Sequence, residues 1–183
     1  MKRFLLVSLI TCHLSLAASV YAAMLRSEHF HEAQVPDEKG MLEKMEYFHG
    51  HLGPYLVLAA KASEIGFREL KTEKGDMNVL LECRIDSPER CMLDGFQTAC
   101  GATLGQGKIA VLKSDSLRVW MIEKKSGVAL KMTLSGKAVE LLKKLPVYQG
   151  KGTDSEEAIA DLAREVSELS GSELWEYSLI LSK

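Results

Sequence analysis

Apolar residues recur at helical spacing in two neighbouring segments in the first half of the chain. Over Pro36–Phe48 they stand three and four residues apart, which predicts an amphipathic helix that stops at the following His49-Gly50-His51. A second run over Pro54–Leu70 has the same spacing and is apolar along most of its first half. Because proline suits the first turn of a helix, we expect a core helix to begin at Pro54.

The pattern then changes to strict alternation. Apolar residues over Val79–Ile85 occupy every second position, which predicts a half-buried strand. Three further strands are predicted over Ile109–Lys113, Ser116–Lys124 and Gly127–Leu134. The short connections between these last three strands favour antiparallel hairpins.

Helical spacing returns in the C-terminal third. One helix is predicted after Ser135 as its cap and another after Thr153, which has Glu156 in capping-box spacing and Gly171 at its end. The apolar tail over 172–181 is expected to dock as a final helix. This order of elements predicts an α+β fold, with an antiparallel sheet of about four strands covered by helices.

The first 23 residues differ from the rest. Lys2 and Arg3 precede an apolar run over 4–16, and small residues follow up to Ala23. This order is typical of a secretory signal peptide, so we expect residues 24–183 to be the exported domain, periplasmic or extracellular. No other apolar run could span a membrane. An uncleaved membrane anchor is the alternative interpretation.

Composition narrows the choice of partners. The 183 residues are enough for one domain, and the net charge of −2 comes with lysines and arginines that are scattered along the chain. No basic patch indicates a nucleic-acid surface.

Cysteine usage limits the redox chemistry. Cys12 falls in the predicted signal peptide, which leaves Cys83, Cys91 and Cys100. With an odd number, at most one disulfide forms within the chain, and one thiol stays free, pairs with a partner or binds metal. Cys83 lies on the inward face of a predicted strand and is expected to fill the core. Cys100 could pair with Cys91 or act as a further ligand.

Two histidines flank Gly50. In an extended segment, His49 and His51 could both turn their imidazoles toward one ion. The helix start at Pro54 places exposed backbone amides near His51, which suits an anion. Two loop histidines satisfied by the backbone are the alternative. His29 and His31 form a second pair with this spacing, in the segment before the first predicted helix.

A second group of polar residues recurs every third position. Cys91, Asp94 and Gln97 would share one face of a short helix. A cysteine near a helix start is suited to be a metal ligand or a nucleophile, and a small buried hydrophobic residue is the alternative. The glycine-rich stretch over 101–108 fits neither a phosphate loop nor a dinucleotide fingerprint. We expect a tight turn there, with Lys108 free to meet an anion.

Together these motifs resemble the FmdE family, named after a component of formylmethanofuran dehydrogenase. FHGHLGPY over 48–55, CMLDGFQ over 91–97 and GATLG over 101–105 are similar to the family pattern FHGHxCPG, CxxDxIQ and TGCTxGKGN. Gly53 and Ala102 stand where many members have cysteine. The resemblance implies an α+β domain, often a homodimer, with a metal in a cleft lined by the histidine and cysteine positions.

Three functions remain open at this point. The first is an exported domain that binds zinc, or another divalent transition metal such as nickel or iron, through His49, His51 and Cys91. An enzyme is compatible with such a site. The second is a non-catalytic module that holds an unknown small molecule. The third is a thiol-redox protein that uses Cys91 with Cys100. The residues expected to line the cleft are Asp94, Gln97, Cys100 and Lys108.

Overall fold

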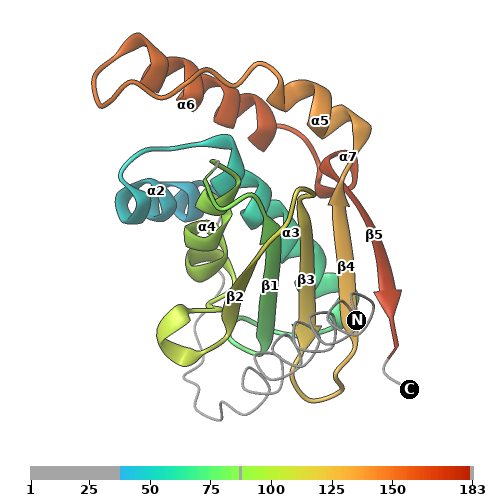
Figure 1. The fold of residues 1–183 in the computed structure, drawn as a ribbon. Helices are drawn as coiled ribbons and strands as arrows, with labels where there is room; N and C mark the ends of the chain where they lie inside the picture. The colour runs from blue at the N-terminus through green and yellow to red at the C-terminus, as the bar shows by residue number, and fades with distance from the viewer. Residues whose placement is uncertain (1–37, 87, 182–183) are drawn as a thin grey trace, which may run out of the picture.

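One mixed sheet organises the computed structural model, which describes residues 38–86 and 88–181. Its strands follow the order β2-β1-β3-β4-β5 (Figure 1). Every neighbouring pair is antiparallel except β1 and β2, which are parallel. The α+β prediction is confirmed, with five strands where about four were expected. The strands are β1 (Met77–Cys83), β2 (Ile109–Lys113), β3 (Arg118–Glu123), β4 (Ala129–Leu134) and β5 (Trp175–Ile180).

The extra strand lies where a final helix was predicted. Only Gly171–Leu174 is helical (α7), and from Trp175 onward the chain pairs with β4. Trp175 is buried, and Tyr177 and Leu179 follow at the two-residue spacing of a strand. The helix prediction was wrong because a short run rich in apolar residues fits both periods, and the free edge of β4 decided between them.

The predicted hairpin between β2 and β3 is also wrong. β1 lies between the two strands, and its Val79 pairs with Ile109 of β2 on one side and Met121 of β3 on the other. Alternation tells which face of a strand is buried, but it does not tell which strand is its neighbour. The predicted hairpin between β3 and β4 is confirmed.

Helices cover one face of the sheet and one of its ends. α3 lies behind the sheet, and α5 and α6 run across its upper end in Figure 1. The predicted end at His49, the start at Pro54 and the cap at Ser135, whose Oγ accepts from the Ala138 N–H at 3.1 Å, are confirmed. The helices are α2 (Glu38–His49), α3 (Pro54–Leu70), η1 (Pro88–Cys91), α4 (Met92–Ala99), η2 (Leu104–Gln106), α5 (Gly136–Leu142), α6 (Asp154–Ser167) and α7.

The capping box forms at a different helix from the one expected. Thr153 makes no side-chain cap to α6, because its hydroxyl donates to the Gly150 carbonyl at 2.7 Å. Ser170 and Glu173 form the box instead, at the start of α7. Gly171 therefore begins α7, and α6 ends earlier, at Ser167.

Two apolar clusters fix the helices. The larger one joins α3 to the inner face of the sheet, where the Trp175 indole N–H donates to the Leu58 carbonyl at 3.1 Å. The smaller one joins α2, α3 and α4 through buried side chains that include Met45, Leu56 and Ala99. This second cluster sets the end of α2 beside the start of α4, from sequence positions about forty residues apart.

Neither the predicted signal peptide over 1–23 nor the pair His29 and His31 falls within the described residues. Within 38–86 and 88–181, no helix has both the length and the apolar character that a bilayer crossing needs.

Candidate functional site

The connection between α2 and α3 presents two histidines. α2 ends at His49, Gly50 follows with a positive φ of 95°, and α3 begins three residues after His51. That backbone conformation favours glycine, so Gly50 allows the sharp reversal. As a result the two imidazoles face each other, with ring centroids 4.8 Å apart and planes inclined at 51°.

The first turn of α4 meets His49. Nδ1 of His49 donates to Oδ2 of Asp94 at 2.7 Å. The Gln97 side-chain amide donates to Oδ1 of the same carboxylate at 3.2 Å, and its oxygen accepts from the Leu104 N–H at 3.0 Å. The predicted polar face of this helix is therefore present, and Gln97 ties the Asp94 carboxylate to the loop after α4.

Cys91 lies directly before α4 and interacts with the same imidazole. A side-chain hydrogen bond with Cys91 is the largest influence on His49, followed by the opposing effect of burial and then by Asp94. Together they raise the pKa of His49 to about 9. His49 is therefore an imidazolium at neutral pH in the metal-free protein. Burial, and then the charge of His49, lower the pKa of His51, so the two rings differ in protonation.

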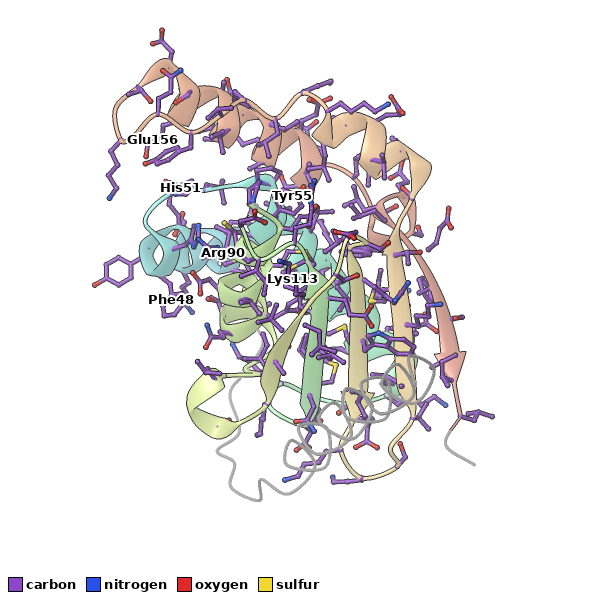
Figure 2. All side chains as sticks on the ribbon, viewed as in Figure 1. Phe48, His51, Tyr55, Arg90, Lys113 and Glu156 are labelled. Atoms are coloured by element: carbon purple, nitrogen blue, oxygen red, sulfur yellow. The ribbon has the colours of Figure 1, made fainter. Side chains whose placement is uncertain are left out.

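These side chains line one cavity of about 490 Å³. His49, His51 and Cys91 form part of its wall, and Tyr55 closes another part. The His51 ring stacks on Tyr148 with centroids 4.8 Å apart and planes inclined at 12°. His51 and Tyr55 both lie beneath α6 in Figure 2. The remaining lining residues are Gly53, Pro54, Pro88, Leu145, Pro146, Val147 and Ile159.

Two expected cleft residues lie elsewhere. Cys100 is fully buried at the end of α4, where its thiol donates to the Phe96 carbonyl at 3.1 Å and burial raises its pKa to about 11. Lys108 is also buried, and its ammonium donates to the Gly75 carbonyl at 2.9 Å. Neither residue lines the cavity, so we remove both from the cleft. Sequence spacing could not show that a backbone carbonyl would take the place of an anion at Lys108.

The distance between Cys91 and Cys100 opposes the thiol-redox alternative. The two residues flank α4 at its opposite ends. With a rise of about 1.5 Å per residue, their Cα atoms lie roughly 13 Å apart, and a disulfide needs less than about 7 Å. Cys83, Cys91 and Cys100 are all free thiols. Pairing within this fold would require α4 to unwind.

One wall of the cavity was not foreseen from the sequence. Leu145, Pro146, Val147 and Tyr148 come from the connection between α5 and α6. A signal was present, because Val147 and Tyr148 are apolar residues in a predicted loop and both are exposed. Exposed apolar residues in succession often mark a binding surface. Tyr55 lay within the recognised motif, although the pattern alone gave it no role.

The order thiol, imidazole, carboxylate suits two kinds of chemistry. A carboxylate that holds one nitrogen of a histidine commonly orients the other nitrogen toward a metal ion. The same order activates cysteine nucleophiles, with the imidazole as base. Within residues 38–86 and 88–181, no three His, Cys, Asp or Glu side chains are already placed to hold an ion.

Comparisons with known proteins agree with the motifs. A probable S-adenosyl-L-methionine-binding protein of Archaeoglobus fulgidus is 24% identical over 106 residues, which is 54% of this chain and 28% of that protein. The chain thus spans little more than a quarter of that relative's length. The crystal structure of an FmdE-like protein of tungsten formylmethanofuran dehydrogenase, from Syntrophus aciditrophicus, shares the fold, with a TM-score of 0.54 and 18% identity. The superposition covers 84% of this chain and 78% of that one. A family model described as "FmdE, Molybdenum formylmethanofuran dehydrogenase operon" matches residues 48–176, and the chain therefore belongs to the FmdE family.

Proposed function

We propose that this protein binds a divalent transition metal through His49, His51 and Cys91, and zinc is the ion to test first. Two imidazoles and a thiolate are ligands that zinc readily accepts. A fourth position would face the cavity and accept water or a ligand. The metal would act there as a Lewis acid, while the chain's own residues orient the ligands and exclude water.

One observation carries this proposal. His49 lies between the Asp94 carboxylate at 2.7 Å and the Cys91 thiol, and His51 stands beside it with ring centroids 4.8 Å apart. Asp94 would keep the proton on Nδ1 of His49 and leave the other nitrogen available to an ion. The second histidine favours a metal over a lone cysteine nucleophile, which needs only one.

The proposal makes a demand on His51. Its ring is stacked on Tyr148, and the three proposed ligands do not yet form a closed group within the described residues. Metal binding should therefore turn this ring away from Tyr148. The chemical shifts of the Tyr148 ring would report that movement.

Elemental analysis of untagged protein purified without chelator tests the site. We expect about one ion per chain, and loss of binding in the variants His49→Gln, His51→Gln and Cys91→Ser. The double variant H29Q/H31Q removes the other pair of histidines and serves as the matched control. Full binding in Cys91→Ser, or loss of binding only in the control, would reject the proposal.

A non-catalytic binding module is the second candidate. It is favoured by the apolar wall of the same cavity, which gives a small molecule surface to pack against. Ligand shifts of equal size with and without metal would favour this candidate over the first.

We also propose that the protein is exported. The basic start, apolar run and small residues over 1–23 support a cleaved signal. N-terminal sequencing of the mature protein should give a start at Ala23 or Met24. An intact Met1 on the cell-associated protein would contradict export by cleavage.

A further inference from the structure

The first turn of α3 leaves a hydrogen-bond donor unpaired beside the cavity. Gly53, at the N-cap, offers no side-chain cap, and Pro54 has no N–H. The Leu56 and Val57 N–H groups both donate to the Gly53 carbonyl, at 3.1 and 3.4 Å. Among the described residues the Tyr55 N–H has no acceptor. Because N–H groups in a first turn point out of the helix, this donor faces the end that the cavity adjoins.

The Tyr55 side chain adds a second donor at the same place. It is 9% exposed and lines the cavity. Its hydroxyl has no hydrogen-bond partner within the part of the chain that the structure describes. The nearest charged residues, Arg84 and Glu89, are engaged with each other at 2.7 Å. A buried phenol without a partner is costly unless a ligand accepts its proton.

Charges around the cavity are mixed. The Lys151 ammonium lies 3.9 Å from the position that a Cβ on Gly50 would occupy, and it makes no ion pair among the described residues. Glu46 and Glu156 also face His51, and Glu156 accepts a hydrogen bond from the Gly152 N–H. The net field is therefore weak, and recognition must come from hydrogen bonds and apolar contact.

We propose that the cavity binds a small organic acid whose carboxylate accepts from both the N–H and the O–H of Tyr55. Two donors match the two oxygens of a carboxylate, whereas a phosphate would keep oxygens without donors. The apolar body would pack against Leu145, Val147 and Ile159. A volume of about 490 Å³ suits a small molecule. This inference deepens the function proposed above and rests on it, because it names the ligand class of the same cavity.

Titration of metal-free, ¹⁵N-labelled protein in EDTA tests the inference without metal. The probes are hexanoate, its neutral analogue hexanamide, and inorganic phosphate. We expect hexanoate to shift the Tyr55 amide resonance saturably and to bind about tenfold more tightly than hexanamide. Equal affinity for acid and amide, tighter binding of phosphate, or no saturable shift up to roughly 10 mM hexanoate would overturn the proposal.

The variant Tyr55→Phe isolates the hydroxyl, because it keeps the ring. Hexanoate should bind about tenfold more weakly to it, while hexanamide binding is unchanged. Tyr47→Phe is the matched control, since Tyr47 is 93% exposed on α2 and should bind like the wild type. Wild-type affinity in Tyr55→Phe would contradict the inference. Zinc is absent throughout, so failure here leaves the metal proposal standing, and failure to bind zinc leaves this one standing.

Discussion

Gly95 of α4 lies so close to Ala59 of α3 that an added Cβ would stand 2.6 Å from the Ala59 Cβ. The same Cβ would meet the Leu56 carbonyl oxygen at 3.0 Å. This close approach of the two helices holds the start of α4 against the core. It thereby sets the positions of Cys91 and Asp94, which precede the contact in the chain.

Gly95→Ala should therefore destabilise the protein. Intrinsic helix propensity alone would give a gain of up to about 1 kcal/mol, but the clash with fixed backbone should cost about 1–3 kcal/mol. Urea unfolding of metal-free protein measures the difference. Gly136→Ala, in α5, is the control, because nothing lies within 4 Å of its added Cβ. A Gly95→Ala variant as stable as the wild type would show that the helices can separate freely.

Asp94→Asn should weaken zinc binding by about 10–100-fold, because His49 loses the carboxylate that fixes its orientation. Competition with a chromophoric chelator measures this affinity. The exposed Asp161, which pairs with Arg164 on α6, supplies the control Asp161→Asn. If both variants bind zinc like the wild type, Asp94 has no role in positioning His49.

The pH dependence of stability should carry the signature of His49. Its pKa is raised from 6.5 to about 9 in the fold, so protonation contributes stability that is fully present below pH 6.5. That contribution is lost as the pH rises through about 9. Unfolding of metal-free wild type and His49→Gln between about pH 6 and 10 tests this sign. The wild type should lose more stability across that window, and parallel curves would contradict the raised pKa.

Native alkylation should distinguish the three thiols. Cys83 and Cys100 are fully buried, whereas Cys91 is partly exposed at the cavity. Iodoacetamide should modify Cys91 first, and zinc should protect it. Peptide mapping by mass spectrometry identifies the modified residue. Unchanged labelling of Cys91 in saturating zinc would mean that its sulfur is not a ligand.

The sequence was most informative where local pattern and chemistry coincide. The helix end at His49, the proline start of α3 and the shared face of Asp94 and Gln97 follow from spacing within a few residues. The strand at Trp175 and the central place of β1 did not, because both depend on which edge of the sheet is free when the segment arrives. Local spacing contains no information on that.

The candidate site divides in the same way. Motif residues from α2 and α4 meet as expected, since His49 contacts Asp94 directly. Lys108 was misassigned because a charged side chain was assumed to seek an anion, while the fold offers it the carbonyl of Gly75. Tyr148 was missed because its role arises only from stacking on His51 across a long sequence separation.

X-ray absorption of the zinc-loaded protein tests the central claim most directly. The account predicts one sulfur at about 2.3 Å from the ion and imidazole nitrogens at about 2.0–2.1 Å, with the sulfur contribution lost in Cys91→Ser. A zinc spectrum with only oxygen and nitrogen neighbours in the wild type would contradict the shared site of His49, His51 and Cys91.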